Sequence, residues 1–122
     1  MTASFEIEAL TPARWPALEA LFRACDSPCF CRFWHFEGDK NAWLARCAEE
    51  PEKNAAEQRA LVDRGDPGGR GLVATRSEEV VGWMKLAPRA ALPKLRARSV
   101  YRALDLGSDE GVWSIGCFLI HP

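Results

Sequence analysis

The sequence is short of several features that would assign it to a function class at once. Its 122 residues include one tyrosine, two histidines and two methionines, and the formal net charge is only −1. A charge balance this close to zero gives no long-range attraction to nucleic acid or to an anionic membrane, so we expect neither partner. No apolar run approaches the roughly 20 residues of a transmembrane helix. The first ten residues carry two acids and no base, unlike a secretory signal peptide, and we expect a cytoplasmic protein.

Cysteine is present, but in an odd number. Without a secretion signal we expect the five thiols to stay reduced; they are Cys25, Cys29, Cys31, Cys47 and Cys117. The first three of them and His35 place four possible zinc ligands within eleven residues, so a zinc site is one interpretation. However, the usual Cys-x2-Cys pair is missing, and Cys-x-Cys in an extended segment directs its thiols to opposite sides. The favoured interpretation is therefore no metal, with the thiols packed among aromatic residues.

The most apolar stretch closes the chain. Residues 111–122 read GVWSIGCFLIHP. β-Branched and aromatic residues bounded by glycine and proline are typical of a strand that is covered on both faces. We predict a central strand over Val112–Ile120 in which Trp113 and Phe118 are core residues, each costing about 3 to 5 kcal/mol on truncation to alanine. The outer edge of this strand has no predicted partner within the sequence.

The remaining patterns predict one domain, residues 1–122, with a mixed, mostly antiparallel sheet flanked by helices. Thr11-Pro12 is a typical helix start, Pro51 separates two helices, and Gly65 suits the position after a helix. The expected elements are a strand at 5–8, helices at 12–24, 39–50 and 52–64, a hairpin of 71–75 with 80–87, and the strand at 112–120. A helical turn is expected near 93–97. The order β-α-α-β-β-β indicates the α/β (α+β) class.

Several segments, taken in order, resemble a known family. They are the aromatic segment Cys29-Phe30-Cys31-Arg32-Phe33-Trp34, the strand pair GLVAT and VVGWMKLAPR, and the closing VWSIGCFLIHP. Together they resemble the GNAT superfamily of acyl-CoA-dependent N-acetyltransferases, in particular a bacterial branch with a Cys-x-Cys aromatic segment. The resemblance covers essentially the whole chain but only the N-terminal two-thirds of that fold. The sequence ends where the family has a basic, glycine-rich loop that holds the pyrophosphate of coenzyme A.

The resemblance implies transfer of an acetyl group from acetyl-CoA to an amine of a small molecule or peptide. It implies that the pantetheine arm of the cofactor lies along the backbone of Phe118, Leu119 and Ile120. It also implies an acceptor pocket with walls from Cys29, Phe30, Phe33, Trp34 and Trp83. Because the pyrophosphate loop is missing, we expect weak cofactor binding and a chain that is inactive alone.

A general base is harder to place, since the last strand contains no carboxylate. Asp109 and Glu110 at its entrance are the nearest candidates, and the alternative for both is an exposed turn acid. The basic stretch from Arg89 to Arg102 could bind phosphate or an acidic acceptor, and its alternative is a solvated loop face.

The main rival to an enzyme is a non-catalytic module. In that interpretation the edge of the last strand pairs with a second copy, or with a partner chain that completes the sheet. A truncated reading frame is a third possibility. We expect the chain to be an oligomer, because an exposed apolar edge strand is prone to pair.

Overall fold

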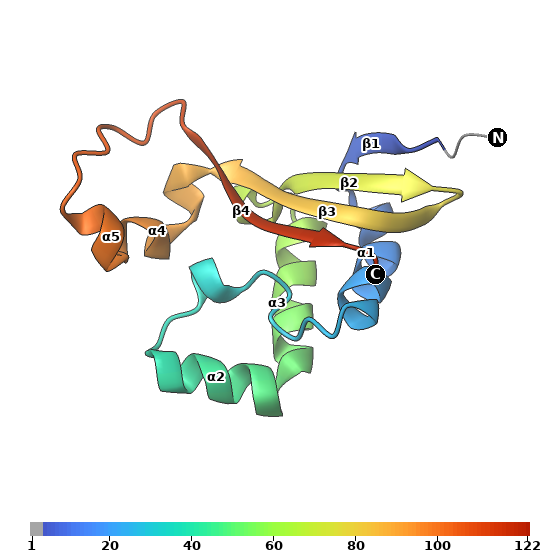
Figure 1. Ribbon diagram of the computed structural model, residues 1–122, viewed down its shortest axis with the longest axis horizontal. Coiled ribbons are helices and arrows are strands. Elements are labelled where there is room, and N and C mark those ends of the chain that lie inside the picture. The colour runs from blue at the N-terminus through green and yellow to red at the C-terminus, as the bar shows by residue number, and fades with distance from the viewer. Residues whose placement is uncertain (1–3) are drawn as a thin grey trace.

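The fold is built on one four-stranded antiparallel sheet with the order β1-β2-β3-β4 (Figure 1). The computed structural model describes residues 4–122, apart from the side chain of Arg96. The strands are β1 (Glu6–Ala9), β2 (Gly71–Arg76), β3 (Glu79–Pro88) and β4 (Trp113–Ile120). The predicted mixture of helices and a mostly antiparallel sheet is confirmed, and within the described residues every strand pair is antiparallel.

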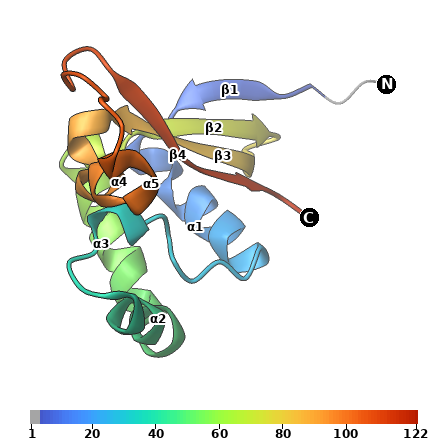
Figure 2. The ribbon, with the colours of Figure 1, turned by 60° about the vertical axis from the view of Figure 1, so that its left-hand side comes forward.

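The helices gather on one face of this sheet, as both ribbon views show (Figures 1 and 2). They are α1 (Trp15–Ala24), α2 (Lys40–Glu49), α3 (Pro51–Asp63), α4 (Pro93–Ala97) and α5 (Ser99–Arg102). Short 3₁₀ turns lie between them, of which η2 (Phe33–His35) and η3 (Pro67–Gly69) matter below. The segment after β3 is thus more helical than the single turn predicted there.

Local signals explain most helix boundaries. The Asp39 carboxylate accepts a hydrogen bond from the Ala42 N–H at 2.8 Å and so caps α2. Pro51 stands at the first position of α3, and Gly65 follows that helix with a φ of +67°, a conformation that glycine adopts without strain. Thr11 is extended before the first helical turn, but its side chain makes no capping hydrogen bond.

The core lies between the sheet and α1 with α3. Helix α1 presents one apolar face at helical spacing, and all four of its members are buried: Trp15, Leu18, Leu21 and Phe22. They pack with Phe30, Val73, Val80 and Trp83 in one cluster. A single face of the sheet therefore supplies the core.

Strand β4 is an edge strand covered on one face only, so the prediction of a doubly covered central strand is wrong. Phe118 is 63% exposed and Ile120 is 71% exposed, and Trp113 and Ile115 are also exposed. Between them, Leu119 and Cys117 pack against the core. No core role therefore remains for Trp113 or Phe118.

The uncovered side of the sheet is apolar, and we call it the open face. Cross-strand pairing places its members side by side: Ile7, Leu72, Ala74, Met84, Ile115, Phe118 and Ile120. A shallow groove of about 230 Å³ runs across part of it, and no charged residue lines this groove.

Candidate functional site

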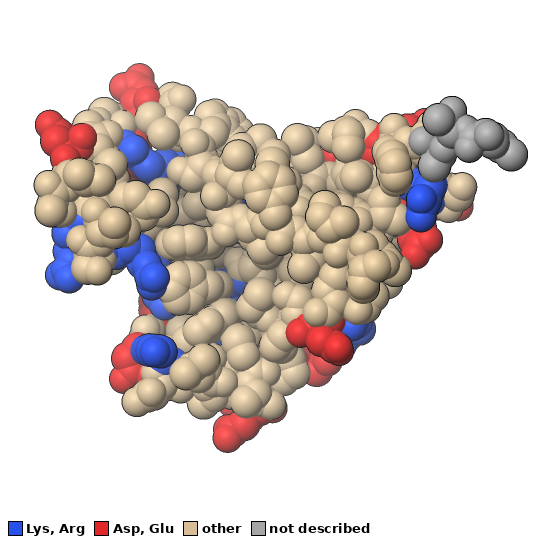
Figure 3. Space-filling view, in the orientation of Figure 1, with Lys and Arg blue, Asp and Glu red and all other residues tan. Residues whose placement is uncertain are grey.

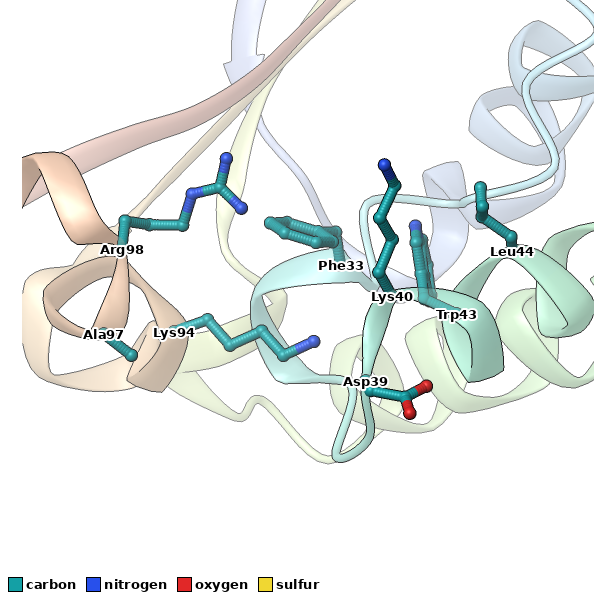
Figure 4. Close-up of a pocket in the computed structure, with 8 residues that line it drawn as sticks. All are labelled: Phe33, Asp39, Lys40, Trp43, Leu44, Lys94, Ala97 and Arg98. Atoms are coloured by element: carbon teal, nitrogen blue, oxygen red, sulfur yellow. The ribbon is translucent and has the colours of Figure 1, made fainter.

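A cleft opens between α4 and the start of α2, and its residues are drawn in Figure 4. Its volume is about 540 Å³, within the usual range of small-molecule sites. The lining residues are Phe33, Asp39, Lys40, Trp43, Leu44, Lys94, Ala97 and Arg98. In the space-filling view the hollow lies between two lobes, with lysine and arginine atoms near it (Figure 3).

The cleft has an aromatic floor. The Phe33 ring lies in η2 and contacts the Trp43 ring of α2 edge-on, with ring centres 5.8 Å apart. The Phe36 ring also packs against Trp43, with ring centres 5.2 Å apart. Edge-on aromatic contacts of this kind fix ring orientation as well as burying apolar area. The floor is thus a preformed surface held between η2 and α2.

Positive charge lies over this floor. The Lys94 ammonium is 4.8 Å from the centre of the Phe33 ring and 5.2 Å from that of Phe36. The Arg98 guanidinium lies 5.3 Å from the Phe33 ring centre. Burial, and then the like charge of Arg98, lower the pKa of Lys94. Figure 4 shows Lys94 of α4 and Arg98, the residue after α4, reaching toward Phe33, with Lys40 and Trp43 on the other side.

The cleft is connected to strand β4 through Trp34. The Trp34 ring meets Phe33 at 5.1 Å, and its Nε1–H donates to the Gly116 carbonyl at 2.8 Å. A Cβ on Gly116 would lie 3.1 Å from that indole nitrogen, so a larger residue there would push Trp34 outward by a few tenths of an ångström. Gly116 sits beside the register shift between Lys85 and Leu86 of β3.

The outer edge of β4 presents backbone groups that β3 does not use. The His121 N–H donates to the Val81 carbonyl at 2.9 Å, so His121 faces β3. Along an antiparallel strand, the backbone N–H and C=O groups of successive residues point alternately toward and away from a given neighbour. The backbone of Leu119 therefore faces β3, whereas those of Phe118 and Ile120 face outward. The Ile120 carbonyl accepts from the Cys25 thiol at 3.4 Å, which leaves two N–H groups as the outward donors.

The acceptor-pocket residues expected from the sequence separate into two groups. Phe33 lines the cleft and Trp34 joins it to β4, as described. Phe30 and Trp83 lie in the core instead, where Phe30 packs on Phe22 and the Trp83 indole N–H contacts the Cys31 sulfur at 3.2 Å. Cys29 lies beside the Ser27 hydroxyl at 3.5 Å and does not line the cleft.

The two candidate bases lie away from the cleft. Asp109 accepts a hydrogen bond from Arg89 Nε at 2.6 Å, and Arg89 also donates to the Ser108 carbonyl. Glu110 is exposed, and its backbone N–H donates to the Ser108 hydroxyl. Neither acid lines the cleft, whereas Asp39 does. The Asp109–Arg89 pair instead ties the entrance of β4 to the end of β3.

The sequence analysis did not single out Lys85, which is fully buried on β3. Its Nζ donates to the Gly68 carbonyl of η3, and burial lowers its pKa to about 8. Cys117 lies opposite it in the strand register. A hydrogen bond from Cys31 lowers the pKa of the Cys117 thiol, which the charge of Lys85 lowers further. The sequence did contain a hint: Lys85 is two residues after Trp83 in an apolar strand, so both side chains point to the same face.

The cysteines of the aromatic segment point into different surroundings. Cys25 contacts the end of β4, Cys29 contacts Ser27, and Cys31 contacts Trp83 in the core. All five cysteines are free thiols. Within residues 4–122 no group of three or more His, Cys, Asp or Glu side chains is arranged to hold a metal ion.

Comparisons with known proteins found no relative. The chain matches no protein-family model, no curated protein and no solved structure. In the described part of the chain, no helix has the length and apolar character needed to span a bilayer.

Proposed function

We propose that the chain is a GNAT-like N-acyltransferase that moves an acetyl group from acetyl-CoA to an amine of a small molecule or peptide. The observation that carries the proposal is the outer edge of β4, where Phe118 and Ile120 present outward N–H groups. Trp34 connects this strand to the cleft. A molecule with amide groups can pair with such an edge as an added strand would.

Each part of the site then has a task. The outward N–H groups of Phe118 and Ile120 would hold the amide carbonyls of pantetheine or polarise an acyl carbonyl. The cleft would hold an acceptor that carries an acidic group besides its amine, since lysine and arginine side chains line it. Trp34 joins the cleft to β4 by its hydrogen bond to the Gly116 carbonyl. Acetyl-CoA, when bound, supplies the acyl thioester. Asp39 lines the cleft and caps α2, whereas neither Asp109 nor Glu110 lines the cleft.

The residues present fit the pantetheine arm and not the pyrophosphate. These 122 residues contain no basic, glycine-rich loop after β4. Among the described residues, binding would rest on the strand edge.

A matched pair of variants tests the strand edge. Phe118→Pro removes the outward N–H without removing a bond to β3, and an edge strand tolerates proline at such a position. Phe118→Ala shortens the same side chain and keeps the N–H. In calorimetric titrations with acetyl-CoA we expect Phe118→Ala to bind like the parent and Phe118→Pro to bind about tenfold more weakly, the usual effect of one hydrogen bond.

Two results would count against the proposal. One is a parent chain that does not bind acetyl-CoA at millimolar concentration. The other is equal binding by both Phe118 variants, which would place the cofactor elsewhere.

A second candidate function is a non-catalytic module that associates with a second copy of itself, and the open face favours it. Its large exposed side chains leave on the order of 600 Å² of apolar surface, close to what one partner contributes to a standard interface. The absence of charge in its groove suits another apolar surface better than a charged partner. Two open faces would then pack as sheets do, face to face.

A further inference from the structure

The cleft holds more positive charge than its neighbours neutralise. We propose that it binds an organic oxyanion with a flat apolar body, such as an aryl phosphate or aryl carboxylate, and that Lys94 and Arg98 hold the anionic group. This inference does not depend on acyl transfer, since it concerns binding in the cleft alone.

The first observation is that the two cations have aromatic rings as their contacts. Lys94 and Arg98 both lie over Phe33, and no carboxylate of the described residues forms an ion pair with either. By contrast, the half-buried Arg32 and Arg46 share the Glu57 carboxylate. An oxyanion between Lys94 and Arg98 would supply the missing counter-charge, and a guanidinium can hold it with two parallel hydrogen bonds.

The second observation is the shape and chemistry of the floor. The rings of Phe33 and Trp43 form one wall, and Leu44 and Ala97 add apolar surface at either side. A flat ring has room to stack there, because the cleft volume is about 540 Å³. A bare inorganic ion would leave this apolar surface exposed to water.

The charge of the cleft disfavours cationic ligands. Three cationic side chains line the cleft, namely Lys40, Lys94 and Arg98, and they would repel a cation. Asp39 lines it too, but its carboxylate is engaged in capping α2. A polyanion such as nucleic acid would need a longer basic surface than this one, and the chain's net charge is −1.

The ligand class can be measured directly by calorimetry. Phenyl phosphate and benzoate are titrated into the parent chain, with inorganic phosphate and benzylamine as comparisons. We expect both aryl oxyanions to bind, benzylamine not to bind, and inorganic phosphate to bind at least about tenfold more weakly than phenyl phosphate. The tighter of the two aryl oxyanions identifies the preferred head group. Binding of benzylamine, or equal binding of inorganic phosphate, would overturn the assignment.

Variants of the basic segment locate the site. Lys94→Gln and Arg98→Gln each remove one charge from the cleft, and Arg102→Gln removes the same charge from α5, outside it. We expect each cleft variant to weaken phenyl phosphate binding about tenfold, and the Arg102 variant to bind like the parent. These side chains are at the surface, and thermal melting checks that each variant is folded. If all three variants lost affinity for phenyl phosphate equally, the attraction would come from overall charge and not from the cleft. If neither cleft variant lost affinity, the proposed site would be refuted.

Discussion

Lys85 combines full burial with a charge-bearing side chain on the sheet. Its ammonium reaches one partner, the Gly68 carbonyl, and its pKa is lowered from 10.5 to about 8 by burial. The unfolded chain holds the proton more tightly than the folded chain over that interval. The folded state is therefore penalised below pH 8, and the penalty disappears as the pH rises toward 10.5.

This shift predicts a stability that increases with pH. Between pH 8 and pH 10.5 the free energy of unfolding should rise by on the order of 3 kcal/mol from Lys85 alone. Urea denaturation at a series of pH values measures it, and Lys85→Met, similar in length and without the charge, serves as the control. The rise should be absent in the variant. A parent whose stability is level over this interval would show that Lys85 keeps its proton inside the fold.

At the scale of elements, β4 shows that a strand's sequence pattern does not determine how many of its faces are covered. Its apolar residues occupy both parities, which is typical of a doubly covered strand, but the helices cover only one side. An apolar side chain carries the same sequence signal whether a helix or another surface covers it. Whether a face of β4 is buried depends on where helices about fifty or more residues away in the sequence pack. The local sequence pattern contains no information about that packing.

The two parities of β4 should differ in their effect on stability. Leu119 packs against the core, whereas Phe118 is 63% exposed on the open face. We expect Leu119→Ala to cost about 2 to 3 kcal/mol and Phe118→Ala less than about 1 kcal/mol. Chemical denaturation should be run at concentrations low enough to give a monomeric mass. Similar losses for the two variants would mean that a surface absent from this structure covers Phe118.

Helix and strand positions were predictable because local signals agree with the fold. Pro12, Pro51 and Pro93 each open a helical segment, and Gly65 follows α3 with a positive φ. The cleft was not predictable in the same way. Phe33 was expected in a pocket through the resemblance alone, and Lys94 could not be told from its basic neighbours, because its contact with Phe33 joins segments about sixty residues apart.

At the scale of the whole molecule, the dominant feature is a sheet with helices on one face and apolar side chains on the other. A patch of this size on a soluble domain usually marks an interaction surface. In the described residues nothing covers it, so the exposed area is a property of the single chain.

We expect the chain to be a dimer at micromolar concentration. Ile120→Lys places a charge on the open face, at the end of β4, where pairing would desolvate it, and should give a monomeric mass by light scattering. Val100→Lys, on α5 and equally exposed, is the matched control and should remain dimeric. A parent that is monomeric throughout the micromolar range would remove the second candidate function.

The turn between β2 and β3 has a consequence for how the chain assembles. Ser77 and Glu78 both have positive φ values, 51° and 66°, and so form the tight kind of hairpin turn that matches strand twist. Pairing of β2 with β3 closes a loop of two residues. Pairing of β1 with β2 instead joins Ala9 to Leu72, 63 positions apart in the sequence. Short closures are faster, so β1 should dock after the transition state of folding. In refolding kinetics, Leu10→Ala should then mainly speed unfolding, whereas Val80→Ala should slow folding.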